Sequence, residues 1–139
     1  MDWTYNGIPF TDDMINDYHG FVYIITDQDT GRMYVGQKNF WTPKVRSIKG
    51  KKKKVKVVSD YKDYFGSNTE LQELVQVKGP DHFKREILHL VKGKGQQNYL
   101  EMREQMDRRV LENPDKYFNA FIGGKIHRKH LTSLVTDDT

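Results

Sequence analysis

Residues 20–36 read Gly-Phe-Val-Tyr-Ile-Ile-Thr-Asp-Gln-Asp-Thr-Gly-Arg-Met-Tyr-Val-Gly, and this stretch decides the fold. Its first part, Phe21–Thr26, is rich in β-branched and aromatic residues, which favour strands. A cluster of turn-forming residues, 27–31, separates it from a second short strand over Met33–Gly36. The stretch therefore predicts a β-hairpin.

The hairpin carries two tyrosines, Tyr23 and Tyr34, on its two facing strands. Their spacing across a short turn places both phenols on one face. A phenol donates and accepts hydrogen bonds, and it can accept a proton when a cation or a metal perturbs its pKa. The simpler interpretation is that aromatic residues favour strands. We therefore treat the pair as a candidate site.

The rest of the chain predicts an α+β fold with helices on both sides of the hairpin in sequence. A short helix is expected over Asp12–Tyr18, with Thr11 as its N-cap. A second helix is expected to start at Ser67 or Asn68 and to end at Gly79-Pro80. A third strand, Phe83–Val91, adds at an edge of the hairpin. A longer helix, about 97–112, follows and ends at Asn113-Pro114; its expected apolar stripe is Tyr99, Leu100, Met106, Val110 and Leu111.

We expect one domain over residues 1–139, built on a small three-stranded antiparallel sheet flanked by helices. Two basic segments depart from this core: an insertion over 42–60 and a polar tail over 123–139. The insertion has no clean period, and it either extends into a ribbon or stays mobile.

The insertion concentrates the positive charge of the chain. The sequence has 23 Lys and Arg and 19 Asp and Glu; without the insertion's cations 15 remain, so the body is acidic. Such a segment directs a positive field at a polyanion, usually nucleic acid. The alternative is a solvated lysine loop that only aids solubility. The eight cations, with no anion among them, are Lys44, Arg46, Lys49, Lys51, Lys52, Lys53, Lys54 and Lys56.

Composition excludes several classes of protein. The chain has no cysteine, which removes disulfides, thiolate metal sites and cysteine nucleophiles. No stretch approaches the ~18 consecutive apolar residues of a membrane span, and the acidic opening is unlike a signal peptide. We therefore expect a cytoplasmic protein without membrane contact, in the host cytoplasm if a phage encodes it. The five histidines form no zinc-binding helical pair, and His127 and His130 are expected in a phosphate-touching tail.

Two three-residue motifs of the hairpin, Phe21-Val22-Tyr23 and Tyr34-Val35-Gly36, stand ten residues apart. Further motifs follow in a fixed order: Tyr64-Phe65-Gly66-Ser67 before a helix, Gly79 ahead of residues 83–88, Glu101 on a helix, and Asn119 after Tyr117. This order and spacing resemble the GIY-YIG nuclease family over roughly residues 21–122. The resemblance implies a GIY-YIG-like fold and hydrolysis of phosphodiester bonds.

The sequence departs from the commonest family pattern at the phosphate-binding positions. Phe21 stands where a glycine gives the family its name, and the arginine and histidine that often follow the second motif have no clear counterpart. Lys38 is the nearest cation, and Arg46 is the only arginine of the interval, so either is a candidate to hold the phosphate. Tyr61 or Tyr64 takes the place of the histidine.

Of these two tyrosines we expect Tyr64, because it adjoins Gly66 and Ser67, where a helix begins. Ser67 joins the eight cations of the insertion as a predicted nucleic-acid contact.

The resemblance also implies Mg²⁺, or another divalent cation such as Mn²⁺, held by one helix carboxylate and the scissile phosphate. We expect Glu101 as that ligand, since Mg²⁺ tolerates a single carboxylate and keeps most of its waters. Glu104, one turn further on the same face, is the open alternative. The ordinary interpretation of either glutamate is a surface ion pair with Arg103, Arg108 or Arg109.

By the same resemblance, Tyr23 acts on the attacking water as a general base or a relay, and Tyr34 orders the phosphate and water. A free phenol has a pKa near ~10, so Tyr23 needs a nearby cation or metal-bound water to accept a proton at neutral pH. Asn119 stabilises the active-site end of the fold or contacts the backbone; its simpler interpretation is a turn asparagine.

The sequence thus predicts a metal-dependent DNA endonuclease, with phage homing, restriction and degradative roles all open. It would act as a monomer or as a transient dimer on DNA. The lysines position a backbone and do not read bases. Two rival interpretations are a non-catalytic nucleic-acid-binding module and an adaptor whose lysines meet an acidic protein.

Overall fold

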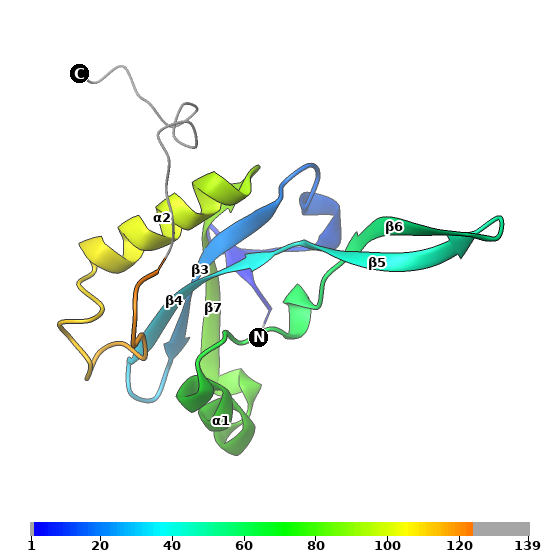
Figure 1. The fold of residues 1–139 in the computed structure, drawn as a ribbon. Helices are drawn as coiled ribbons and strands as arrows, with labels where there is room; N and C mark the ends of the chain where they lie inside the picture. Colours follow the sequence, from blue (N-terminus) through cyan, green and yellow to red (C-terminus); the bar gives the residue numbers. More distant parts are fainter. Residues whose placement is uncertain (1, 124–139) are drawn as a thin grey trace, which may run out of the picture.

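The computed structural model describes residues 2–123, and Figure 1 shows the order of its elements. The strands are β1 (Thr4–Tyr5), β2 (Ile8–Pro9), β3 (Gly20–Asp27), β4 (Met33–Asn39), β5 (Trp41–Ile48), β6 (Lys51–Val58) and β7 (Phe83–Val91). The α-helices are α1 (Thr69–Lys78) and α2 (Lys94–Asp107). Single 3-10 turns lie at Asp12–Met14, Tyr61–Asp63 and Pro80–His82. Over this part of the chain, no helix has the length and apolar character needed to cross a membrane.

The central sheet is mixed and has five strands within residues 2–123, in the order β2-β1-β7-β3-β4. The α+β class is confirmed, but the expected three strands are too few. The third strand adds antiparallel to β3, as predicted, yet it is not at the edge because β1 pairs with it in parallel. Two-residue strands such as β1 and β2 have no sequence period of their own, and only their tertiary partners define them.

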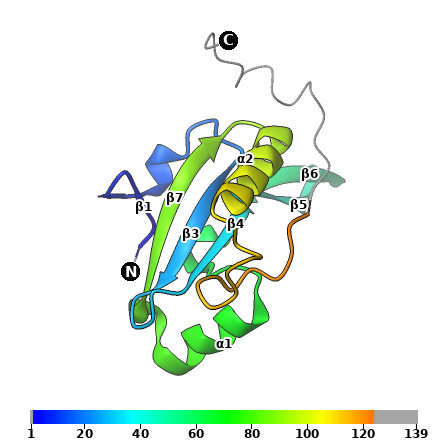
Figure 2. The ribbon, with the colours of Figure 1, turned by 90° about the vertical axis from the view of Figure 1, so that its left-hand side faces the viewer.

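Strand β3 is buried on both faces because the sheet has a core on each side. Phe21, Tyr23 and Ile25 belong to the larger cluster with Trp3, Phe40 and other aromatic residues. Val22 and Ile24 alternate with them and pack in a second cluster with Val35, Val110 and Tyr117. Figure 2 shows α2 lying across the face of β7, β3 and β4, while α1 lies at one end of the sheet. The near-continuous apolar run of β3 follows from this double burial.

Helix α1 agrees with its prediction: Asn68 is the N-cap, its side chain accepts from the backbone N–H of Leu71, and Gly79 ends the helix. Helix α2 begins at Lys94, earlier than expected, because Gly93 adopts the extended conformation of an N-cap. Residues 94–96, which precede the predicted helix, thus belong to the first turn of α2.

Helix α2 also ends earlier than predicted, at Asp107. Arg109 has a positive φ of 55°, which turns the chain and brings Val110 back against the sheet, fully buried. Of the predicted apolar stripe, Met106 and Leu111 are largely exposed. Turning the chain at this point buries Val110 and leaves Met106 and Leu111 on the outside.

The predicted helix over 12–18 is also wrong beyond its first turn. Only Asp12–Met14 is helical, as a 3-10 turn, and Asn16 has a positive φ of 48°. The buried side chain of Ile15 explains the change, because it anchors the segment to the aromatic core.

The basic insertion forms a two-stranded ribbon, β5 and β6, which pairs with no strand of the central sheet. This confirms the ribbon alternative over the mobile loop. Figure 1 shows the ribbon continuing from β4 and projecting away from the body. Its strands are joined at Lys49 and Gly50, both with positive φ, as in a tight two-residue hairpin turn. The basic tail beyond residue 123, including His127 and His130, lies outside the described residues.

Candidate active site and nucleic-acid interface

The two motif tyrosines lie on the same face of the hairpin, as predicted. Tyr23 pairs with Gly36, and Tyr34 pairs with Ile25. Paired residues share a face of the sheet, as do Tyr23 and Ile25 two positions apart on β3, so both phenols lie on the same face. Their ring centroids are 6.2 Å apart. Tyr23 is fully buried beneath the edge strand β4, and Tyr34 is partly buried at that edge.

Two glycines make this approach of the rings geometrically feasible. A Cβ at Gly36 would collide with the phenol oxygen of Tyr23 and would stand 2.9 Å from the ring of Tyr34. Gly66 has a positive φ of 88°, and a Cβ there would stand 3.3 Å from the Tyr34 ring. The small residues in both motifs therefore leave space for the phenols.

Of the two tyrosines in the segment before α1, the structure brings Tyr64 to the site. Its ring meets Tyr23 edge-on with centroids 6.0 Å apart. The Nζ of Lys38 lies 4.3 Å from the centroid of the Tyr64 ring. Tyr61 instead packs in the aromatic core, and its hydroxyl donates to Asp12. The preference for Tyr64 as the residue adjoining the site agrees with this geometry.

The two helix carboxylates have different surroundings. Glu101 accepts a hydrogen bond of 3.0 Å from Gln37 on β4, and burial raises its pKa above the ordinary value. Glu104 bonds to His89 at 2.8 Å and to Arg108 at 2.9 Å. Burial raises the pKa of Glu104, but these two bonds outweigh it and the net pKa is lowered. Glu104 thus has the ion-paired role that was the ordinary interpretation for either residue.

Several predicted site residues converge on a cavity of about 140 Å³ beside β4. The hydroxyls of Tyr34 and Ser67 are 3.0 Å apart at its wall. Tyr34 comes from one face of the sheet and Glu101 from the helix on the other face, so they meet across the edge strand. The described residues that line the cavity are Tyr34, Ser67, Asn68, Glu101, Gln105, Asn119, Ala120, Phe121 and Gly123.

Asn119 holds the chain that closes this cavity. Its side-chain oxygen accepts from the backbone N–H of Val35 at 3.0 Å, and its amide donates to the carbonyl of Val35 at 2.8 Å. Gln105 donates to the same carbonyl at 3.0 Å. Asn119 therefore bonds to the outer edge of β4 as a further strand would, which is the backbone-contacting role predicted as one alternative.

The environment of Tyr23 disfavours its ionised form. Burial raises the pKa of Tyr23 well above 10, and the neighbouring Tyr64, Tyr34 and Glu101 raise it further. Burial also raises the pKa of Tyr34, against a hydrogen bond from Ser67 that lowers it. Both phenols are therefore protonated at neutral pH. Proton transfer to Tyr23 would require a cation that lowers its pKa.

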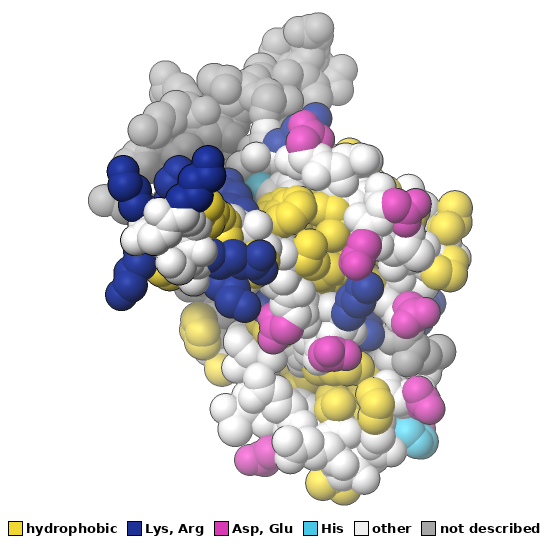
Figure 3. All heavy atoms as spheres, turned by 90° about the vertical axis from the view of Figure 1, so that its right-hand side faces the viewer, with side chains coloured by type: hydrophobic (Ala, Val, Ile, Leu, Met, Phe, Trp, Pro, Cys, Tyr) yellow, Lys and Arg dark blue, Asp and Glu magenta, His cyan; other side chains and the backbone are white. Residues whose placement is uncertain are grey.

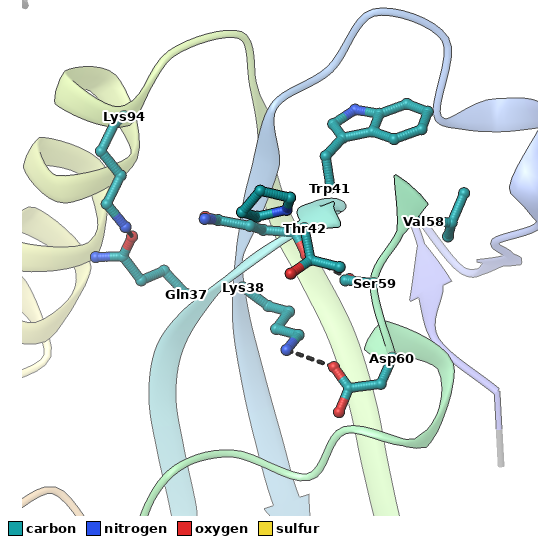
Figure 4. Close-up of a pocket in the computed structure, with 10 residues that line it drawn as sticks. Gln37, Lys38, Trp41, Thr42, Val58, Ser59, Asp60 and Lys94 are labelled. Carbon is teal, nitrogen blue, oxygen red and sulfur yellow. Dashed lines mark hydrogen bonds and ion pairs between the residues drawn. The ribbon is translucent and has the colours of Figure 1, made fainter. Parts of the chain in front are cut away.

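A larger cleft of about 570 Å³ lies next to this cavity, at the base of the ribbon (Figure 4). Gln37 connects the two, because it lines the cleft and also bonds to Glu101. Lys94 donates to the side-chain oxygen of Gln37 at 2.8 Å. Lys38 lines the same cleft and pairs with Asp60 at 2.7 Å, with its side chain 20 % exposed. Of these two lysines, Lys94 acts electrostatically on Glu101, whereas Lys38 pairs with Asp60.

Sequence reasoning missed Gln37 and Lys94. Gln37 directly follows Gly36 and lies on the face of β4 opposite to Tyr34. It belongs to none of the motifs. Lys94 precedes Glu101 by two helical turns, but the predicted helix begins only at about residue 97. Had α2 been extended to Lys94, the shared helix face would have indicated the contact.

The predicted role of Arg46 at the phosphate is not supported. Arg46 lies on β5 opposite Lys53, about 16 Å along the strand from Trp41 at the base of the ribbon. It is exposed and lines neither the cavity nor the cleft. Arg46 is the only arginine of the interval, but it lies on the ribbon, which projects away from β4. Lys38 stays the candidate of that pair.

The cations of the insertion are all exposed on the ribbon. No ion pair joins any of the eight to another residue in the described part of the chain. Figure 3 views the ribbon from its tip, where Lys and Arg side chains gather above and below it. The ribbon thus presents an exposed positive surface that extends outward from the cleft at its base.

A family model described as "Putative endonuclease segE, GIY-YIG domain" matches residues 3–122, nearly the whole described chain. Searches of curated proteins and of solved structures each found no match. The family match includes every residue of the cavity except Gly123.

Proposed function

The chain belongs to the GIY-YIG endonuclease family, and on this basis we propose that it is a metal-dependent endonuclease that cuts DNA at the Tyr34–Glu101 cavity. The observation that carries the proposal is the convergence of Tyr34, Ser67 and Glu101 on one small polar cavity. These residues are far apart in sequence, and a purely structural role would not require their polar groups to face the same space.

The donor chemistry of the cavity suits a single-carboxylate metal site. The described residues contain no cluster of three or more His, Cys, Asp or Glu that could hold a metal. Glu101 is half-buried, and its raised pKa shows that its charge is poorly compensated. Mg²⁺ or Mn²⁺ would remove this penalty and take its other ligands from water and phosphate oxygens. When bound there, such a cation supplies Lewis-acid charge and a bound water of lowered pKa.

The chain's own residues then divide the remaining tasks. The hydroxyls of Tyr34 and Ser67 donate to non-bridging phosphate oxygens, which stabilises the charge that develops during hydrolysis. Tyr23 lies behind them with its hydroxyl donating to Tyr64; as a relay it would accept a proton from the attacking water and pass its own proton to the Tyr64 oxygen. Lys38 contributes positive charge over the Tyr64 ring. Asn119 acts by positioning, because both of its printed bonds go to Val35.

The test is nicking of supercoiled plasmid with Mg²⁺, with Mn²⁺ and with EDTA. We expect nicks only with a divalent cation, and loss of cleavage in Glu101→Gln. The matched control is Glu104→Gln, one turn away on the same helix, which should still cleave if it folds. Binding of DNA without cleavage under all divalent conditions would overturn the proposal in favour of a non-catalytic module.

We assign no preferred target sequence, because backbone contacts carry no base information. The proposed enzyme is a nuclease of the phage homing or degradative kind, which acts as a monomer or as a transient dimer. Mapping the nicks on a long duplex distinguishes the two kinds: clustered cuts indicate homing, and dispersed cuts indicate degradation.

A further inference from the structure

The ribbon places its cations on two opposite faces. Antiparallel register puts Lys44, Arg46, Lys51 and Lys53 on one face, and Lys52, Lys54 and Lys56 on the other, with Lys49 in the turn. This follows because side chains alternate along a strand and directly paired residues share a face. A ribbon that lay flat on one phosphate backbone would need cations on one face only.

The dimensions of the ribbon suit a groove between two backbones. Each strand has eight residues and so spans about 25 Å at ~3.3 Å per residue. A two-residue turn closes the tip, so the end is no wider than the pair of strands. The major groove of B-DNA, about 12 Å wide, admits a two-stranded ribbon, whereas the minor groove, about 6 Å wide, is too narrow.

We propose that the β5–β6 ribbon inserts into the major groove of duplex DNA, with one cationic face toward each phosphate backbone. This inference rests on the proposed DNA substrate and adds that the substrate is double-stranded. Insertion would anchor the duplex at the base of the ribbon, where the cleft of Lys38 and Lys94 leads through Gln37 to Glu101.

Apolar side chains on the ribbon fit the same placement. Val45 is 58 % exposed and Ile48, next to the turn, is 41 % exposed. Apolar side chains exposed to water are less favourable than the same side chains in contact with another surface. Val45 lies on the face of Lys52, Lys54 and Lys56, and Ile48 lies on the opposite face, so insertion into the groove would cover one apolar side chain on each face.

The experiment measures affinity for a mixed-sequence duplex in EDTA, so that binding is read without cleavage. Two matched triple variants each remove three cations from one face: Lys44, Arg46 and Lys53→Gln, or Lys52, Lys54 and Lys56→Gln. A third variant, Lys84, Lys92 and Lys116→Gln, removes the same charge from the body. We expect both ribbon variants to weaken binding about tenfold or more and to reduce the salt slope by about 2 to 3 each, with little effect of the body variant.

A second measurement uses the unaltered protein, so it does not depend on how the variants fold. Methyl green, which occupies the major groove, should displace the protein, and netropsin, which occupies the minor groove, should not. Three results would overturn the inference: weakening by only one ribbon variant, displacement by netropsin alone, or equal affinity for single-stranded DNA. Loss of plasmid nicking with intact groove competition would refute the nuclease proposal and leave this inference standing.

Discussion

Glu101 shows how one side chain balances stability against function. It is half-buried beside Tyr34, with the amide of Gln37 as a hydrogen-bond donor, and burial raises its pKa above 4.5. Folding therefore favours the protonated carboxyl over the carboxylate. In Glu104, one turn away, His89 and Arg108 reverse this balance. The two residues share an amino-acid type and a helix, and their neighbours separate their roles.

The raised pKa of Glu101 predicts a sign for its effect on stability. The native protein binds a proton at Glu101 up to a higher pH than the unfolded chain does, so this contribution is present below pH 4.5 and lost as pH rises through the native pKa. Without metal at pH 7, Glu101→Gln should therefore unfold at a higher temperature than the wild type. The difference in melting temperature between the variant and the wild type should become smaller toward pH 4, as thermal melts at several pH values would measure.

Addition of Mg²⁺ should raise the melting temperature of the wild type more than that of Glu101→Gln. A larger Mg²⁺ shift in the variant would exclude Glu101 as the ligand. Glu104→Gln, which breaks an ion pair, should instead be less stable than the wild type at pH 7.

Tyr23→Phe removes the hydroxyl and keeps the aromatic ring, so it tests the hydroxyl alone. The ring contacts with Trp3 and Tyr64 are retained, whereas the buried hydrogen bond to Tyr64 is lost. We expect cleavage to fall by about 10²- to 10⁴-fold, as for loss of a proton-transfer group. DNA affinity should stay within about twofold, which is less than ~0.5 kcal/mol. Full nicking activity in this variant would remove Tyr23 from the chemistry.

At the scale of elements, β4 is both the edge of the sheet and the wall of the site. Tyr34 and Lys38 extend from one face, and Val35 and Gln37 from the other. Its outer edge would expose unpaired backbone groups, but Asn119 and Gln105 bond to Val35 there. An edge protected in this way leaves the side chains on both faces free for the site.

Asn119→Ala should destabilise the protein by about 2 kcal/mol, because the buried N–H of Val35 would lose its partner. Urea unfolding measures this change. The control is Asn113→Ala, which removes a side-chain bond to the exposed carbonyl of Arg109 and should cost less than ~0.5 kcal/mol. Equal effects of the two substitutions would contradict the role of Asn119 at the β4 edge.

At the scale of the whole molecule, the acidic body and the basic ribbon are separate structural units. The ribbon pairs only within itself among the described strands, and Ser59 bonds to Phe40 at its base. The body has its own two apolar clusters. The apolar clusters of the fold therefore lie in the body, and the densest positive charge lies on the ribbon.

Replacement of residues 45–54 by Asn-Gly should leave the body folded. Lys44 and Val55 are directly paired in the same phase of the ladder as Ile48 and Lys51, which flank the natural turn, so a two-residue turn can join them. We expect a melting temperature within a few degrees, about 3 °C, of the wild type. Plasmid nicking should persist at low salt and be lost near 0.15 M salt, because most phosphate contacts are gone. Unfolding of the shortened chain would show that the ribbon supports the body.

Much of the site was predictable because local sequence patterns indicate the strands and helices that hold its residues. The hairpin over 20–36 follows from β-branched residues and a turn, and the shared face of Tyr23 and Tyr34 follows from strand alternation. Strand β7 and the Asn68 cap of α1 follow from equally local signals. In contrast, β1 and β2 have too few residues for any period.

The amino-acid sequence by itself determined the hairpin and the charge of the insertion, since each depends on neighbours along the chain, and the order of its motifs indicated Tyr34, Ser67, Glu101 and Asn119 as candidate site residues. Only the tertiary structure gave Glu101 and Glu104 different partners, placed Arg46 on the ribbon away from the cavity, and brought Gln37 and Lys94 to Glu101. These outcomes depend on burial and on which surfaces meet across β4. Burial and contact are properties of the packed molecule, and no local pattern encodes them.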